Sequence, residues 1–278
     1  MAGRKFTIGI VAPAARVDRS IVQPILDIAG ELYGNEVEIR FHPSSFGGHG
    51  HFSADDRTRA AAFLDYAGSD EIHAMWFGRG GYGSARIAAA VLAGLDPSAL
   101  EKPYLGYSDI ATLLSGLYKL GAPRVAHGPV AQDVRRDGGP EAARRALRWL
   151  VERSPDSLEA GVSETSRTAA FNLTVLCHLV GTPWEPDLAG HVLLIEEVAE
   201  QMYRIDRSFC QLAHTDMFRR AAGLRLGRCS EIIPNQPDFA LSEEEIARHW
   251  SEVAGIPYLG RADIGHDAGN KVVPFGSL

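Results

Sequence analysis

One segment, Tyr104–Thr112, restricts the possible folds of this chain more than any other. Its first two residues read as the end of a short buried strand, Gly106 allows a sharp turn, and Ile110–Leu120 has apolar residues at helical spacing. A serine at such a turn, here Ser108, projects its hydroxyl above a sheet, beside the free N–H groups and partial positive charge of a helix N-terminus. The usual G-x-S-x-G is absent, however, because Asp109 and an isoleucine follow the serine. The pattern therefore predicts either a nucleophile at Ser108 or a plain helix N-cap at Ser108 or Asp109.

A glycine-rich loop is the second local pattern. It spans residues 78–84, follows an expected strand over Glu71–Phe77, and precedes an expected helix over Ala85–Leu92. Dinucleotide and phosphate sites also begin with a strand, a glycine-rich loop and a helix, but the spacing here is not G-x-G-x-x-G and no Walker lysine follows. We therefore interpret the loop as a donor of backbone N–H groups beside a site, and not as a nucleotide motif.

Strands and helices alternate as far as about residue 125. Further strands are expected over 6–12 and 36–41, and helices over 19–32 and 54–66, the second helix being capped by Ser53. Such repetition predicts a parallel sheet with helices on both faces. Sites in these sheets lie at the carboxyl ends of the strands, where both the glycine-rich loop and the serine turn are found. The two segments are therefore expected to share one crevice.

The second half of the chain has a different composition. A polar segment over 133–160, typical of a crossover between two domains, precedes it. Periodicity then predicts a helix over 169–180, an apolar strand over 192–195, a helix over 242–253 and a strand over 256–259.

Two acidic residues and one histidine are the polar features of this half that could carry chemistry. Glu196 and Glu197 end the apolar strand and could orient a histidine at a cleft, or could form a solvated charge cluster. His266 lies in a loop after the last strand, where a histidine is usually only a surface residue. His127, at the end of a strand over 125–130, could be a base or a strand-end residue satisfied by the backbone.

Composition excludes several classes of protein. The net charge of −7 and the absence of a basic run interleaved with aromatics argue against nucleic acid as a partner. Three widely spaced cysteines favour neither a disulfide framework nor a metal site, and His42, His49 and His51 lack the frame of a metal centre. No apolar run reaches the roughly 18 residues of a membrane span, and the N-terminus does not resemble a signal peptide. A cytoplasmic protein is expected.

Several motifs in a fixed order resemble one family, the LD-carboxypeptidases, serine peptidases that include the muramoyl-tetrapeptide carboxypeptidases and the microcin C immunity peptidases. They run from Ile8–Pro13 through Arg79–Arg86, Gly106–Thr112, His127–Pro129, Asn172–Leu173, Gly181–Trp184, Leu194–Val198, Tyr203–Arg207 and Gly265-His266 to Pro274–Gly276. Each motif is weak alone, but the ordered set spans nearly the whole chain.

The resemblance implies a set of site residues. By it, Ser108 is the nucleophile, His266 the base and Glu196 the acid of a triad, and the backbone N–H groups of Gly81 and Asp109 form the oxyanion hole. The implied reaction is hydrolysis of the bond to the terminal D-alanine of a murein tetrapeptide, without a metal or another cofactor.

A carboxypeptidase must also bind a free carboxylate. Arg79, Arg86 and Arg204 in the matched motifs are the candidates for a bidentate clamp, and Tyr82 is a further substrate-binding candidate.

The resemblance also implies an architecture and an assembly. The fold class is α/β, with an N-terminal flavodoxin-like parallel sheet and a smaller C-terminal α/β domain of the swivelling type, and the usual assembly is a homodimer. On this chain the expected division is 1–128 for the domain with the nucleophile, 129–166 for the linker and 167–278 for the domain with the glutamate and histidine. Where the family has Gly-Gly-Asn-Leu, this chain has Ala170–Leu173, and it ends soon after Pro274–Gly276, which puts a final strand in doubt.

Two other functions stay open from the sequence. An immunity-type peptidase that cleaves aminoacyl-nucleotide conjugates would keep the triad and require an aromatic side chain to stack on the base, for which Trp184 is the candidate, although a core position suits it too. A non-catalytic ligand-binding or sensor protein on the same fold would be expected to lack part of the triad, whereas all three residues are present.

Overall fold

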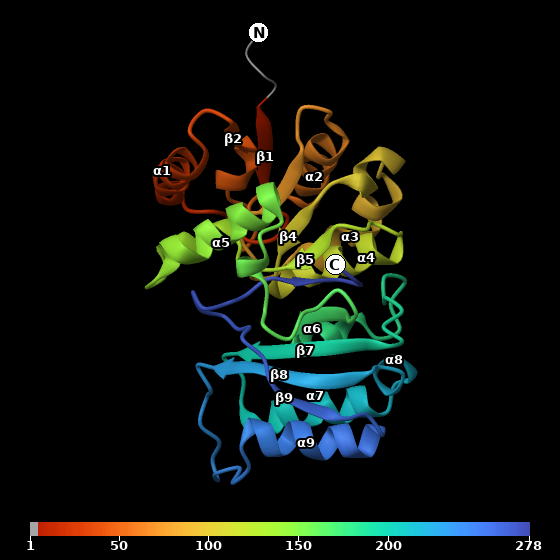
Figure 1. Ribbon diagram of the computed structural model, residues 1–278. Coiled ribbons are helices and arrows are strands. Elements are labelled where there is room, and N and C mark those ends of the chain that lie inside the picture. The colour runs from red at the N-terminus through yellow and green to blue at the C-terminus, as the bar shows by residue number, and fades with distance from the viewer. Residues whose placement is uncertain (1–4) are drawn as a thin grey trace.

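The computed structural model describes residues 5–278, which form two sheets arranged one above the other (Figure 1). All strand pairs are parallel except β10 with β5 at the edge of the first sheet. The first sheet has the order β10-β5-β4-β3-β1-β2 and the second the order β6-β7-β8-β9. The strands of the first sheet are β1 (Phe6–Val11), β2 (Val37–Phe41), β3 (Ala74–Phe77), β4 (Tyr104–Gly106), β5 (Val125–His127) and β10 (Val273–Pro274). Those of the second are β6 (Arg167–Asn172), β7 (His191–Val198), β8 (Gly223–Ser230) and β9 (Tyr258–Arg261).

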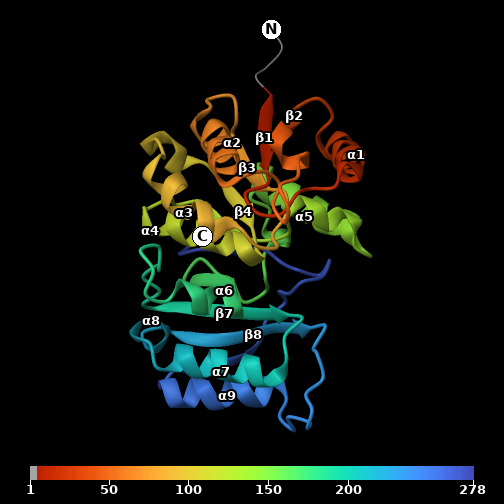
Figure 2. The same ribbon diagram turned by 180° about the vertical axis from the view of Figure 1, so that it is seen from behind.

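Helices cover both faces of the first sheet, as the alternating pattern predicts (Figures 1 and 2). The helices are α1 (Val22–Tyr33), α2 (Asp56–Gly68), α3 (Ser84–Ala93), α4 (Ala111–Lys119) and α5 (Gly139–Glu152). One apolar cluster joins α1 and α5 to the sheet, and another joins α2, α3 and α4 to it. The order β2-β1-β3-β4-β5 is that of flavodoxin-like sheets. The α/β fold class is thus confirmed.

The second sheet is covered mainly on one face. Helices α6 (Leu173–Leu179), α7 (Met202–Ala213) and α9 (Glu243–Ala254) pack in one cluster with β7 and β8, and α8 (Asp216–Arg219) is a short turn between α7 and β8. The same cluster includes residues of α2, α3 and α4, so the apolar core is continuous from one sheet to the other.

Two local predictions are wrong. The expected helix over 169–180 is a strand up to Asn172 and a helix only from Leu173. Ala169–Phe171 are fully buried beside β7, and a short apolar run of this kind does not distinguish a buried strand from a helix. Helix α2 is capped by Asp55, which accepts from Thr58 N at 2.8 Å, whereas the Ser53 hydroxyl donates to the Ala12 carbonyl at 2.6 Å.

The last strand crosses from one half of the molecule to the other. β10 pairs antiparallel with β5, with Val273 opposite His127, and just beyond it Gly276 pairs with Thr168 of β6. The final strand that the short C-terminus put in doubt is therefore present, and it joins the two sheets.

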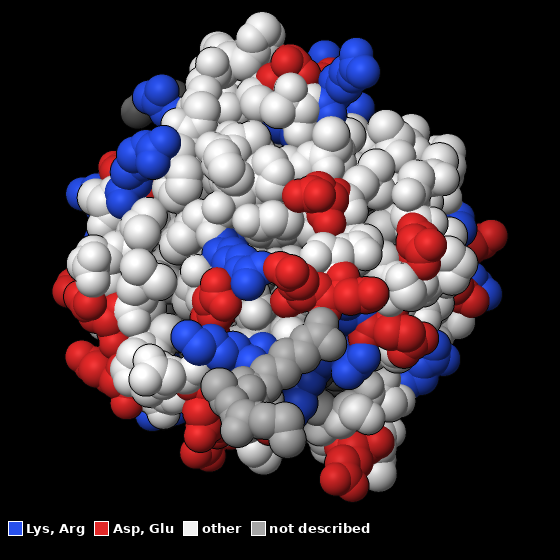
Figure 3. Space-filling model, turned by 90° about the horizontal axis from the view of Figure 1, so that it is seen from above, with Lys and Arg blue, Asp and Glu red and all other residues white. Residues whose placement is uncertain are grey.

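The face of the molecule seen from above carries charges of both signs (Figure 3). On the face seen in Figure 3, Lys and Arg side chains are interspersed with Asp and Glu. None of the helices described between residues 5 and 278 combines the length and the hydropathy needed to span a bilayer.

Candidate active site

Three side chains that are far apart in the sequence meet between the two sheets. Ser108 follows β4, Glu196 lies in β7, and His266 lies in the loop between β9 and β10. His266 Nε2 is 2.9 Å from Ser108 Oγ, and His266 Nδ1 is 2.6 Å from Glu196 Oε2. Glu196 is 0% exposed. The imidazole therefore links a hydroxyl to a fully buried carboxylate, the arrangement required of a base that is oriented by an acid.

The environment of His266 favours its charged form. Burial by itself would lower the pKa of the imidazole, but the charge of Glu196 and the hydrogen bond to it outweigh burial, so the pKa of His266 is raised above its ordinary value. Glu196 thus stabilises the imidazolium that forms when Nε2, the ring nitrogen facing Ser108, takes up a proton.

Ser108 has a left-handed backbone, with φ of 63°. Positive φ is costly for a residue with a Cβ and is often found at functional sites. Ser108 is the first residue of a single 3-10 turn, Ser108–Ile110, that leads into α4. The side chains of Ser108 and Asp109 do not cap this turn, because its N-cap is Tyr107. The N-cap interpretation of these two residues is therefore wrong.

This strained turn leads to a prediction about stability. Ser108→Gly should be more stable than Ser108→Ala by about 1 kcal/mol, because both lack the hydroxyl but only glycine adopts positive φ at no steric cost. Denaturant unfolding of the two variants measures the difference. Equal stability, or a more stable alanine variant, would contradict the strain.

The glycine-rich loop lies directly against Ser108. A Cβ on Gly80 would come within 3.0 Å of Ser108 Cβ, and Gly81 has φ of 98°. A side chain at Gly80 would therefore press on the serine. The expectation that both segments share one crevice is confirmed, since Arg79, Gly80, Gly81 and Ser108 line the same pocket.

Buried polar side chains hold this loop in place. The Asp109 carboxylate accepts from Ser84 N at 2.9 Å, at the start of α3. Arg59, 1% exposed, donates to the carbonyl of Gly83 at 3.0 Å and also to that of Pro13. Burial raises the pKa of Asp109, whereas its hydrogen bonds from residues 83–84 oppose the shift.

The pocket beside Ser108 has a volume of about 480 Å³ and a cationic wall. Arg79, Arg135 and Arg136 line it together with Gln132 and Asp133. Arg135 pairs with Asp18 at 2.9 Å and Arg136 with Asp133 at 2.8 Å, whereas Arg79 donates to the Arg16 carbonyl at 3.3 Å.

Of the four predicted substrate-binding residues, only Arg79 lines this pocket. Arg86 pairs with Asp56 at 2.7 Å, and Arg204 lies 3.6 Å from Glu200. Tyr82 is 51% exposed and its ring is near those of His51 and Phe52. These three residues do not line the Ser108 pocket, because neighbouring positions in a motif need not face the same cavity, and their role in substrate binding stays a prediction.

The sequence did not point to three further residues of the pocket wall, because the segment after β5 has the polar composition of a crossover between domains. These residues are Gln132, Arg135 and Arg136. A usable signal was present: this segment follows the carboxyl end of a third parallel strand, where sites are found.

The neighbouring glutamate, Glu197, has a different environment from Glu196. Its carboxylate accepts from Asn172 Nδ2 at 2.6 Å, Thr174 N at 2.9 Å and Val198 N at 2.8 Å. It therefore ties β7 to the start of α6. Trp184 lines another cavity together with Leu92 and Leu120. Part of its side chain packs against the apolar core, in agreement with the core position considered for it from the sequence.

A second buried group supports the loop that carries His266. Asn270 Oδ1 is 3.2 Å from Gly265 N and 3.0 Å from His127 Nε2, and both Asn270 and His127 are 0% exposed. Burial lowers the pKa of His127 to about 4, so this imidazole is neutral near pH 7 and does not act as an ion. His127 Nε2 thus has a side-chain partner and not the expected backbone partner, and Nδ1 is buried without a hydrogen bond. Among residues 5–278 no cluster of His, Cys, Asp or Glu has the arrangement of a metal site.

Comparison with known proteins agrees with the geometry. Residues 8–128 match the model of the LD-carboxypeptidase N-terminal domain, and residues 165–278 match that of the LD-carboxypeptidase C-terminal domain. A probable murein peptide carboxypeptidase of Bacillus subtilis is 29% identical, over 98% of this chain and 87% of the relative.

Solved structures with the same fold span nearly the whole chain. The muramoyltetrapeptide carboxypeptidase from Oxalobacter formigenes is 25% identical with a TM-score of 0.81, covering 97% of this chain and 92% of that one. The microcin C7 self immunity protein MccF, in complex with aspartyl sulfamoyl adenosine, is 18% identical with a TM-score of 0.78, covering 99% and 92%. On the two family models together, the chain belongs to the LD-carboxypeptidase family of peptidases.

Proposed function

We propose that this peptidase is a serine-type LD-carboxypeptidase that removes the terminal D-alanine from murein tetrapeptides. The observation that carries the proposal is the continuous contact from Ser108 Oγ through the His266 imidazole to the Glu196 carboxylate, at 2.9 and 2.6 Å. This is the order of groups that activates a serine.

In the proposed reaction His266 Nε2 takes the proton of Ser108 as Oγ attacks the scissile carbonyl carbon. Glu196 holds the proton of Nδ1 and stabilises the imidazolium. The imidazolium then protonates the leaving amine, D-alanine departs, and an acyl ester remains on Ser108. Water, deprotonated by the same imidazole, hydrolyses the ester and restores the serine.

The backbone N–H groups of Gly81 and Asp109 would stabilise the tetrahedral oxyanion. The contact between Gly80 and Ser108 supports this role, since it brings the glycine-rich backbone to the attacking oxygen. Removing one such donor typically costs about 3 kcal/mol of transition-state stabilisation.

Arg79 is the best candidate for binding the terminal carboxylate of the substrate. It lines the Ser108 pocket, and unlike Arg135 and Arg136 it has no carboxylate partner within the described residues. Its guanidinium is thus the least compensated of the three cations. A carboxypeptidase requires such a group because the free carboxylate would otherwise lose its hydration without replacement.

The raised pKa of His266 predicts the pH dependence. Only neutral imidazole can accept the serine proton, so kcat/KM should fall as the pH drops through the raised pKa of His266. The acid limb of the kcat/KM profile is therefore expected above the ordinary histidine value of about 6.5. An acid limb below that value would contradict the assignment of Glu196 as the carboxylate that raises the pKa of His266.

Asn270 is predicted to act as a positioning residue. Asn270→Ala removes the acceptor that binds Gly265 N, so the loop is freer and His266 spends less time at Ser108. We expect kcat to fall about tenfold or more with little change in KM. Asn270→Asp keeps an acceptor oxygen and should recover part of the loss. Asn235→Ala, which removes an acceptor of Met202 N elsewhere, is the matched control. Unchanged kcat in Asn270→Ala would remove this role.

The substrate class is tested with two compounds, a murein tetrapeptide and an aminoacyl sulfamoyl adenosine, and product release is followed by mass spectrometry. Release of D-alanine by the wild-type chain supports the proposal, and cleavage of the nucleotide conjugate alone would replace it with the immunity-type activity. The murein substrate is favoured because the aromatic lining of the Ser108 pocket is Tyr107, which is buried, whereas Trp184 lines another cavity. Binding of either compound without turnover would favour the sensor alternative.

The remaining expectations stay predictions. They are the division at residues 128 and 167, a cytoplasmic location and a homodimer, the last testable by light scattering.

A further inference from the structure

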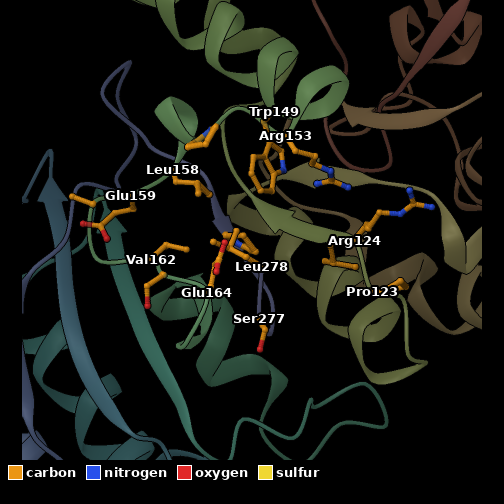
Figure 4. Close-up of a pocket in the computed structure, with 15 residues that line it drawn as sticks. Pro123, Arg124, Trp149, Arg153, Leu158, Glu159, Val162, Glu164, Ser277 and Leu278 are labelled. Atoms are coloured by element: carbon orange, nitrogen blue, oxygen red, sulfur yellow. The ribbon is translucent and has the colours of Figure 1, made fainter.

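A second cavity, of about 730 Å³, lies at the junction of the two sheets, away from Ser108 (Figure 4). Its walls come from the beginning of β5, the end of α5, the segment 155–164 and the last residues of the chain. Ser108 lies beyond the carboxyl end of β4, whereas Pro123–Val125 of this cavity lie at the opposite, amino end of neighbouring β5. Small-molecule sites have volumes of about 300–1,000 Å³, so the cavity has the right size for a ligand.

Two arginines supply uncompensated positive charge to this cavity. Neither Arg124 nor Arg153 forms an ion pair within residues 5–278. Arg124 donates to the Glu101 carbonyl, whereas Arg153 Nη2 is buried without a hydrogen-bond partner. Burial and the neighbouring charge of Arg124 lower the pKa of Arg153 to about 10, so it remains protonated near pH 7. A buried cationic N–H without an acceptor is costly, and an anion would satisfy it.

The acidic residues of the wall do not cancel this charge. Glu159 is buried and bound to Arg225, and it accepts from Asp263 N at 3.2 Å. Glu164 is exposed and in Figure 4 lies near Val162, on the side of the cavity opposite Arg124. The positive end of the cavity is therefore separate from its acidic side.

The rest of the wall is largely apolar. Arg153 stacks over Trp149, with its guanidinium carbon 4.8 Å from the ring centroid. Val125, Leu158, Val162 and Pro274 add aliphatic surface. An occupant with only a charged head would leave this surface in water, whereas an apolar body would bury it.

We infer that this junction cavity binds an amphiphilic anion, with a carboxylate or phosphate head at Arg124 and Arg153 and an apolar body along Leu158 and Val162. The ligand would contact a segment next to the His266 loop, because Glu159 N donates to the Val272 carbonyl at 3.0 Å. A ligand that binds only the folded chain also stabilises it by mass action, so Tm should rise with ligand concentration.

The test uses octanoate, octyl phosphate and octanamide as probes, titrated into the full chain by calorimetry. One or both anions should bind at one site and raise Tm, and comparison of the two identifies the preferred head group. Octanamide has the same apolar body without charge and should bind at least about tenfold more weakly, as expected when charge-assisted hydrogen bonds are lost.

Variants locate the site. Arg153→Met keeps a long side chain over Trp149 and should weaken anion binding at least about tenfold, and Arg124→Gln provides a second test should the first variant fold poorly. Arg148→Met, exposed on the same helix, and Arg79→Met, in the Ser108 pocket, should leave binding unchanged. The inference fails if neither anion binds at millimolar concentration, if Arg153→Met and Arg124→Gln both bind as the wild type does, or if Arg79→Met abolishes binding.

Discussion

Ser108→Ala is expected to lower kcat by about 10⁴-fold or more, because loss of a triad nucleophile leaves only the rate enhancement from binding and the oxyanion hole. KM should change little, since the arginine-lined wall of the pocket is untouched. Release of D-alanine from murein tetrapeptide, followed under saturating substrate, measures the effect.

Ser115→Ala is the matched control for this experiment. Ser115 is buried in α4, the helix that follows the turn with Ser108, and its hydroxyl has no hydrogen-bond partner in the described chain. Its substitution should leave kcat within a few-fold of wild type. Full activity in Ser108→Ala would remove the proposed mechanism altogether.

Glu196→Gln is expected to lower kcat by about 10³–10⁴-fold, as loss of the orienting carboxylate does in other triads. The amide cannot stabilise the imidazolium, and its N–H₂ group can hold the imidazole in the wrong tautomer. The acid limb of the kcat/KM profile should also move to lower pH, because the charge of Glu196 is what raises the pKa of His266. A variant with reduced kcat and an unmoved acid limb would show that another group raises this pKa.

The next residue provides the control. Glu197→Gln should reduce stability, because the Glu197 carboxylate accepts hydrogen bonds from Asn172 and Thr174 at the start of α6. The acid limb of the kcat/KM profile of Glu197→Gln should stay at the wild-type pH, since Glu197 does not contact the His266 imidazole. The pair Glu196→Gln and Glu197→Gln thus separates orientation of the base from folding of the strand that carries it.

Much of the first sheet was predictable from local patterns. Strands ending in Phe77 and Gly106 are short apolar runs followed by glycine-rich turns, and these features depend on neighbours in sequence alone. The helix expected over 242–253 is a further example: it begins with a serine, a residue type that caps helices, and the Ser242 hydroxyl accepts from Glu245 N at 3.3 Å. The strand at Ala169–Phe171 was not recognisable, because it exists only through pairing with β7.

The meeting of Ser108, Glu196 and His266 could not be derived from spacing. They lie on β4, β7 and the β9–β10 loop, and only the resemblance to a family suggested that they belong together. The cationic wall was harder still. Nothing local distinguishes Arg135 and Arg136, which line the pocket, from Arg86, which pairs with Asp56 on the outside.

The crossing of the final strand has a consequence for how the protein can move. The loop with His266 is anchored at one end to β9 of the second sheet and at the other to β10 of the first. A hinge rotation that separated the sheets would therefore pull this loop from both ends and displace the imidazole. On this geometry we expect substrate to enter and product to leave the Ser108 pocket while the two halves stay together, without a large-scale opening during turnover.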